Sequence, residues 1–232
     1  MKRSTRIHPP ARRLPGARWI DVVRRLVHDR GAISAVEFAL LAPLMTTAGL
    51  GGIELANLAM TYTRVSQVAI QVADNTSRAK QATGANGAMM REHDVNDAFA
   101  QVDLVYPGLD FYTNGRVIVS SLEQNSGSGQ WVHWQRCRGA YSAGVSKYGV
   151  QGTGASGTAF AGMGPAGNVV TADSQSAIMF VEVYYRYRPV FFTIGSGALP
   201  VIYRAAAMYV RDDRDLAQLY NPAPTATSYT CS

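Results

Sequence analysis

The 232-residue chain is long enough for one medium-sized domain with an anchor, or for two small domains. Its net charge of +6 is unevenly distributed, because nine of the 22 Lys and Arg but only two of the 16 Asp and Glu lie in residues 1–31. Clustered arginines either bind nucleic-acid phosphates or flank a membrane segment on its cytoplasmic side. Since the basic stretch runs directly into an apolar one, we expect a membrane flank and no nucleic-acid partner.

An apolar run follows this basic leader. No Lys or Arg lies between Gly31 and Arg64, and the charges in that interval are Glu37 and Glu54. Residues 38–53 carry no charge and would measure about 24 Å as a helix. Continued through Met60, the run passes the roughly 20 residues that cross a bilayer. We therefore predict one membrane span at about residues 33–60, with residues 1–31 in the cytoplasm and the rest outside it.

Two helices are predicted around this run. Apolar and basic residues interleave over residues 18–30, which favours a short amphipathic helix on the anionic membrane surface. Beyond the apolar run, Val65, Val68, Ala69 and Val72 form a stripe at helical spacing, and no Gly or Pro interrupts residues 53–83. The apolar and striped parts should therefore form one long helix over residues 32–83, with a kink at Pro43.

Residues 84–232 have the pattern of a small α+β domain. A helix is expected at 91–105 with Asp94 as its N-cap, and strands at 117–122 and 131–134 should form a hairpin. Nine glycines predict a long irregular loop at 139–168. The strongest strand pattern covers residues 177–188, and a weaker one covers 201–210. The tail from Arg211 is polar and would be held only by a disulfide.

No catalytic or metal-binding constellation emerges from the spacing of reactive residues. The GxGxxG pattern at 152–157 lacks a preceding strand and a following helix, so a flexible loop is favoured over a dinucleotide site. Asp212, Asp213 and Asp215 alternate with Arg211 and Arg214, which is typical of self-neutralising surface charge. We expect no enzymatic activity, no metal and no cofactor.

Three residues nevertheless call for a role. Glu37 lies just inside an apolar helix, where a carboxylate is costly and usually functional; the alternative is that it snorkels to the interface. Cys137 and Cys231 would lie outside the cytoplasm, where a disulfide between them is permitted; the alternative is two unrelated free thiols.

The stretch from about residue 29 to 62 closely resembles the TadE-like family, minor pilins or pseudopilins of the tight-adherence (Tad) pilus. The family motif is Gly, a few small apolar residues, Val-Glu-Phe-Ala-Leu, a Pro within the helix, and Gly-Ile-Glu. Residues 183–189 show a second, weaker similarity to the family. The motif positions in this chain are Gly31, Val36, Glu37, Phe38, Pro43, Gly52 and Glu54. The resemblance implies a type IV pilin-like plan, with one helix in the inner membrane and a periplasmic domain.

The resemblance also implies processing and partners. A prepilin peptidase would remove the basic leader at Gly31 or Ala32, and Glu37 would neutralise the new amino terminus within the apolar core of a filament. Cleavage after Ala32 makes Glu37 the fifth mature residue, as in the family, whereas cleavage after Gly31 makes it the sixth. The expected partners are other pilin or pseudopilin subunits and Tad assembly proteins, and the protein would be pilus-associated.

Two functions from different classes stay open at this point. The first is a structural or assembly component of a Tad-type pilus or related secretion apparatus. The second is a membrane-tethered envelope protein that binds a ligand or acts as a sensor, with no role in pili. The second would leave the leader uncleaved.

Overall fold

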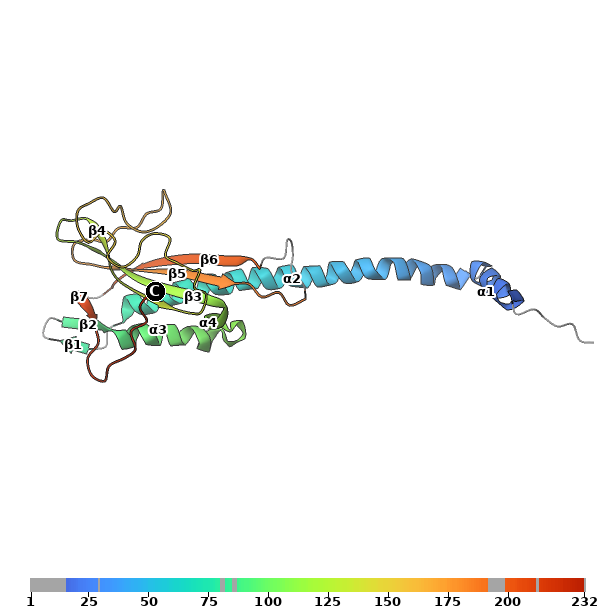
Figure 1. Cartoon of the computed structure of the whole chain (residues 1–232), viewed down its shortest axis with the longest axis horizontal. Coiled ribbons are helices and arrows are strands. Elements are labelled where there is room, and N and C mark those ends of the chain that lie inside the picture. Colours follow the sequence, from blue (N-terminus) through green and yellow to red (C-terminus); the bar gives the residue numbers. More distant parts are fainter. Residues whose placement is uncertain are drawn as a thin grey trace, which may run out of the picture. The chain divides into compact units, whose positions relative to one another are not determined.

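The computed structural model describes residues 16–28, 30–79, 82–84, 87–191, 199–211 and 213–231. The chain divides into two compact units, Met1–Ile53 and Glu54–Ser232. Figure 1 shows the elements of both units. The predicted plan, a long apolar helix followed by a small antiparallel-sheet domain of the α+β class, is confirmed.

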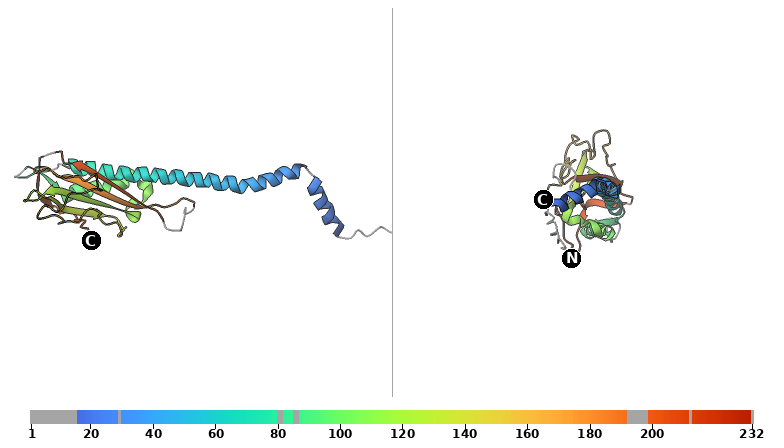
Figure 2. Two further views of the ribbon diagram at one scale, coloured as in Figure 1. Left: turned by 90° about the horizontal axis from the view of Figure 1, so that it is seen from above. Right: turned by 90° about the vertical axis from the view of Figure 1, so that its right-hand side faces the viewer.

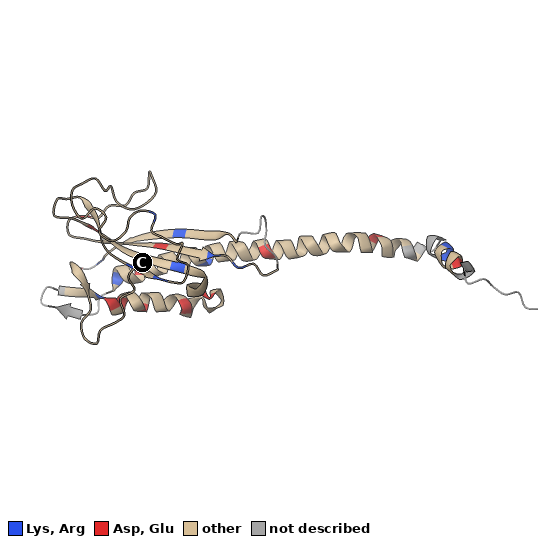
Figure 3. Cartoon of the chain, in the orientation of Figure 1, with Lys and Arg blue, Asp and Glu red and all other residues tan. Residues whose placement is uncertain are grey.

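The described part of the first unit is helical. Helix α1 covers Gly16–His28 and contains most of the predicted amphipathic helix, and α2 begins at Arg30 and continues to Arg78. The helix passes through Pro43 without ending. Figure 3 shows that the part of α2 in this unit is almost free of charge, whereas α1 and the second unit carry most of the charged residues. Among the described residues, α2 is the one helix that is long and apolar enough to cross a membrane.

The second unit is built on a four-stranded antiparallel sheet in the order β4-β3-β5-β6. Its strands are β3 (Gly115–Gln124), β4 (Gln130–Arg138), β5 (Ile178–Arg186) and β6 (Val201–Tyr209). Strands β3 and β4 form the predicted hairpin, and the two predicted later strands pair with each other. The register pairs Gly115 with Tyr185 at one end of the sheet and Leu122 with Ile178 at the other.

Both faces of this sheet are covered. Val181, Val183 and Tyr185 of β5 pack into a core that includes the stripe of α2 and the apolar face of α3 (Glu92–Val105) (Figure 2). The alternate positions Ile178 and Phe180 contribute to a second cluster with side chains from residues 139–177, which join β4 to β5. Because the two faces are both buried, β5 reads as a nearly continuous apolar strand.

The GxGxxG pattern lies within this connection and is held in place. Thr153 O accepts a hydrogen bond from Val132 N (2.9 Å), and Gly152 N donates to Val132 O (2.8 Å), so the turn pairs with β4. Gly154 has φ +75°, and a Cβ there would lie 2.1 Å from Gln130 O, so a glycine is required. The motif is therefore a tight turn against a strand and not the flexible loop expected from its composition.

Helix α3 begins one residue later than expected and has a different cap. Its N-cap is Arg91, and Asp94 is the third helical residue, whose carboxylate accepts a hydrogen bond from Arg91 N (2.9 Å). The prediction of Asp94 as N-cap is therefore wrong by one turn, although its carboxylate still stabilises the helix start. After α3 the chain forms the short helices η1 (Pro107–Leu109) and α4 (Phe111–Asn114).

A second sheet, which the sequence did not predict, lies near the end of α2. It contains β1 (Ala82–Gly84), β2 (Gly87–Arg91) and β7 (Arg214–Tyr220), with β2 and β7 parallel. Helix α2 accordingly ends at Arg78 and not at residue 83. The tail beyond Arg211 is held by β7 as well as by Cys231.

Arg214 corrects the interpretation of the Asp/Arg run as surface charge. Its side chain is buried and donates to Thr76 O (3.0 Å) and Ser77 O (2.8 Å), two carbonyls in the last turn of α2. Such carbonyls have no partner within the helix, and a cation there also interacts favourably with the helix dipole. Asp213 and Asp215 flank this contact, and Asp212 lies outside the described residues.

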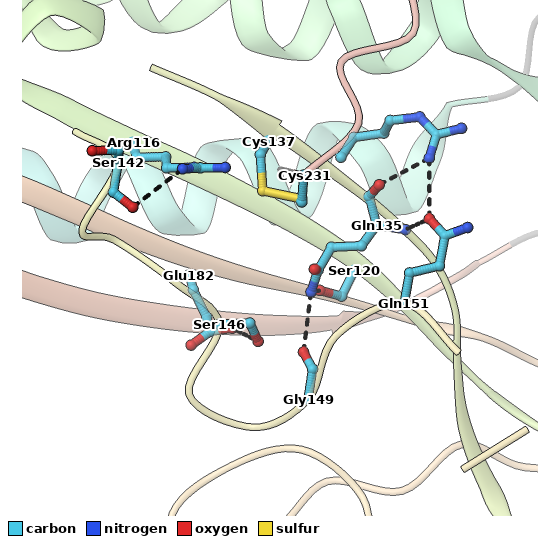
Figure 4. The surroundings of a disulfide bond; sticks show 11 residues. Arg116, Ser120, Gln135, Cys137, Ser142, Ser146, Gly149, Gln151, Glu182 and Cys231 are labelled. Carbon is cyan, nitrogen blue, oxygen red and sulfur yellow. Dashed lines mark hydrogen bonds between the residues drawn. A yellow bond between two sulfur atoms is a disulfide. The ribbon is translucent and has the colours of Figure 1, made fainter. Parts of the chain in front are cut away.

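Cys137 and Cys231 are joined as a disulfide, with their Cα atoms 4.9 Å apart (Figure 4). The neighbouring tail also pairs with β4, because Cys137 N donates to Tyr229 O (2.7 Å). The ring of Tyr229 packs against Phe99 of α3 with its centroid 6.3 Å away. The bridge thus fastens the C-terminal segment across β4 and α3.

This pairing predicts a thiol count. Alkylation of the denatured protein from an oxidising compartment should modify no cysteine without reductant and both cysteines after reduction, as read from the intact mass. Replacing both cysteines with Ala should destabilise the domain by about 2–4 kcal/mol, since the loop that the bridge closes is long. Two alkylated thiols before reduction would contradict the pairing.

Candidate functional site

The first candidate surface is the apolar side of α2 before Glu54. Large side chains there are strongly exposed: Phe38 by 73%, Leu40 by 74% and Leu44 by 63%. Burying such a side chain is worth about 1.5–3 kcal/mol, so a row of them is unfavourable in water. This part of α2 therefore requires an apolar environment, from lipid or from other helices.

The two threonine hydroxyls of this stretch are satisfied locally. The hydroxyl of Thr46 donates to Ala42 O (2.8 Å) and that of Thr47 donates to Pro43 O (2.7 Å). Such back-bonding is how hydroxyls are accommodated in a helix that water does not reach. The threonines thus add no unsatisfied donor to the apolar surface.

The sequence-predicted processing residues lie in the first turns of α2. Gly31 and Ala32 follow its first residue, Arg30, and Val36, Glu37 and Phe38 come within the next two turns with exposed side chains. Within the described residues, no hydrogen bond or ion pair of the Glu37 carboxylate is present. Its charge therefore projects from a stretch of α2, residues 31–53, that has no other charged residue.

Among the described residues, none explains why position 52 is a glycine. A Cβ built on it, or on Gly49, would have no heavy atom within 4 Å. Both positions are helical, where glycine costs roughly 1 kcal/mol relative to alanine. Small residues at such positions allow another helix to approach closely.

Glu54 behaves in the opposite way to Glu37. Its side chain is fully buried, at 0% exposure, whereas its neighbour Leu55 is 57% exposed. The carboxylate accepts a hydrogen bond from the hydroxyl of Tyr187 (2.5 Å) and from the backbone N–H groups of Val190 and Phe191 (both 3.0 Å). This one side chain joins α2 to the segment that follows β5.

Tyr187 connects Glu54 to a second position on α2. Its hydroxyl accepts a hydrogen bond from the side-chain amide of Asn57 (2.8 Å) while it donates to Glu54. Burial, and then the hydrogen bond to Glu54, raise the pKa of Tyr187 to about 12. The phenol therefore stays protonated, and remains a donor to Glu54, throughout the neutral range.

Sequence reasoning placed Glu54 in the motif but assigned it no partner. The contact joins residues 133 positions apart, and no local pattern could reveal it. The one sequence feature that pointed to this region was the weaker similarity to the family at residues 183–189, which include Tyr187. The structure brings this stretch and the Gly-Ile-Glu end of the motif together, whereas Cys137 and Cys231 lie elsewhere in the domain.

Substitution of Glu54 tests this contact. Glu54→Gln keeps the shape of the side chain but turns an NH2 group toward the donors. The free energy needed to open residues 190–191 should therefore fall by about 2 kcal/mol. Hydrogen exchange of the Val190 and Phe191 amides should accelerate roughly thirty-fold. Tyr187→Phe, which keeps both backbone hydrogen bonds, should have a smaller effect. Unchanged exchange in Glu54→Gln would show that the carboxylate does not hold this segment.

Comparison with known families supports the resemblance seen in the sequence. A family model described as TadE-like protein matches residues 32–74. The match covers the exposed apolar part of α2, Glu54 and the whole stripe of Val65, Val68, Ala69 and Val72 that enters the domain core. Comparison with curated proteins and with solved structures returns no match. Residues 32–74 of this chain are therefore similar to TadE-like proteins.

Proposed function

We propose that this chain is a minor pilin or pseudopilin of a Tad-type pilus or related secretion apparatus. It is anchored in the inner membrane by α2, with residues 1–31 in the cytoplasm and the domain in the periplasm. The observation that carries the proposal is Glu37: a carboxylate without an intrachain partner among the described residues, six positions after Gly31 in an exposed apolar helix. The TadE-like match over the same residues supports it.

Cleavage by a prepilin peptidase would give this carboxylate its partner. A cut after Gly31 or Ala32 leaves a positively charged amine about 6–8 Å from Glu37 along the helix axis, at 1.5 Å per residue. Residues four apart on a helix are neighbours, so the new amine can pair with the Glu37 of its own subunit or with that of a neighbouring subunit displaced along the axis. Pairing the two charges removes the large cost of leaving either one unpaired in an apolar core.

The membrane span ends at residue 53 in this proposal, earlier than the sequence suggested. Glu54 and Thr61 are buried within the second unit, and Leu58 packs on its core, so these side chains cannot face lipid. Residues 33–53 form a helix of about 31 Å, which matches the roughly 30 Å hydrocarbon core of a bilayer. Other pilin subunits and Tad assembly proteins would contact this helix and the connection between β4 and β5, which exposes Val145 and Val150.

One observation favours the second candidate, an envelope binding or sensor protein. A cavity of about 300 Å³ lies beside the disulfide and is lined by Ile118, Gln135, Val145 and Cys231, with the buried Arg116 as its cation. Its size is at the lower end of that of ligand sites. A binding protein built around this cavity would need neither cleavage nor a pilus.

Processing separates the two functions. Mass spectrometry of the protein from cells with prepilin peptidase should find an N-terminal peptide starting at Ala32 or Ile33, and cells without the peptidase should retain the leader. Glu37→Gln should still be cleaved but should reduce incorporation into, or assembly of, pili, whereas the matched control Thr46→Val on the same helix should behave as wild type. An identical N-terminal peptide in both strains would remove the processed-pilin proposal.

A further inference from the structure

The segment after β5 forms one end of the second unit. Residues 187–191 follow β5 at the end of the sheet where Gly115 of β3 pairs with Tyr185 (Figure 1). The β3–β4 turn, with Ser126 exposed, lies at the opposite end, because β3 runs the length of the sheet between them. The two ends are therefore separated by about 30 Å, at roughly 3.3 Å per strand residue.

Glu54 fixes the first of these ends at a defined point on α2. Its carboxylate holds the N–H groups of Val190 and Phe191, and it directly follows the charge-free residues 38–53. If those residues cross the bilayer, residues 190–191 lie at the level where the helix leaves it. This step rests on the membrane span of the proposed function, but not on the pilus role.

Apolar side chains project from this end. Val190 is 61% exposed and Phe191 is 49% exposed, and Leu55 on the adjoining part of α2 is 57% exposed. An exposed valine and phenylalanine on consecutive residues are unfavourable in water. Aromatic and aliphatic side chains of this kind are well accommodated at a membrane interface.

A polar cavity of about 270 Å³ adjoins these side chains. It is lined by Asn57, Thr61 and Arg64 of α2, by Gly108 and Leu109 of η1, and by Tyr185, Tyr187, Arg188, Pro189 and Val190. Within the described parts of the chain, neither Arg64 nor Arg188 has a carboxylate within 4.0 Å. The nearby Glu54 carboxylate is directed to Tyr187 and the two backbone donors, and Asp110 is an exposed acidic neighbour of Tyr185.

We propose that this end of the domain binds the outer surface of the membrane that α2 crosses. The cavity takes the phosphate of an anionic phospholipid between Arg64 and Arg188. The Asn57 amide donates one N–H to Tyr187 and has a second N–H as a further donor, whereas the Thr61 hydroxyl donates to Asn57 O (2.8 Å). Val190 and Phe191 enter the interfacial region beside it. Arginine pairs with phosphate through two parallel hydrogen bonds, and basic groups at a membrane surface are attracted to anionic lipids.

Contact of the segment with lipid can be measured by depth-dependent quenching. The full-length protein carrying Phe191→Cys or Val190→Cys is labelled with an environment-sensitive fluorophore and placed, one copy per disc, in nanodiscs of phosphatidylcholine and phosphatidylglycerol. Lipids with a nitroxide near the headgroup should quench both labels. A label on Ser126→Cys, at the far end of the sheet, should not be quenched.

The same experiment separates this inference from the membrane anchor on which it rests. A label on Leu44→Cys, within the span, should be quenched by nitroxides deep in the acyl chains. Quenching at position 44 without quenching at 190 or 191 overturns the inference and leaves the anchor intact. No quenching at 44 overturns both.

The headgroup site is tested by binding of a soluble short-chain phosphatidylglycerol to the full-length protein in non-ionic detergent. The double variant Arg64→Gln/Arg188→Gln should bind about ten-fold more weakly or worse. Arg78→Gln, at the other end of the same helix, should bind as wild type, and all variants should keep the thermal midpoint of the wild type. Equal binding by the double variant overturns the site, and equally tight binding of inorganic phosphate shows a free-anion site and not a lipid site.

Discussion

The burial of one carboxylate, Glu54, determines how this chain is divided between two environments. Up to residue 53, α2 exposes apolar side chains on all sides; from Glu54 onward it contributes one face to a protein core. A buried carboxylate without donors would be strongly destabilising. Tyr187 and the backbone of residues 190–191 supply those donors, so helix and domain are joined at the first residue after the apolar stretch.

The contrast between Glu37 and Glu54 shows how the same side chain serves two purposes on one helix. Glu54 obtains its hydrogen-bond partners from its own chain, and its role is to hold the domain on α2. Glu37, 17 residues earlier, has none among the described residues. In the proposed pilin, its partner would be a cleaved amino terminus, of its own chain or of another subunit.

Local patterns were sufficient to predict the long helix and the four strands of the main sheet, but not the second sheet. The stripe of Val65, Val68 and Val72 reveals the second half of α2, and the alternating apolar residues of β5 reveal the central strand, because burial on a defined face imposes a period. The second sheet escaped prediction because β2 and β7 are short, parallel and more than 120 residues apart. Arg214 was misread for the same reason: its partners, Thr76 and Ser77, lie at the end of a helix far earlier in the chain. The Glu54–Tyr187 contact is likewise a tertiary contact, which the local sequence around either residue does not predict.

The central claim is that α2 changes surroundings at Glu54, and a spin-label scan of the full-length protein in a bilayer tests it most directly. Labels would be placed singly at exposed positions of α2 between residues 38 and 70, and their collision with oxygen and with a water-soluble nickel reagent would be compared. The account predicts lipid-like access on every face through residue 53, followed by a sharp rise in access to the aqueous reagent, with protection on the face that contains Leu58 and Val65. Lipid-like access on every face continuing to Met60 would contradict it.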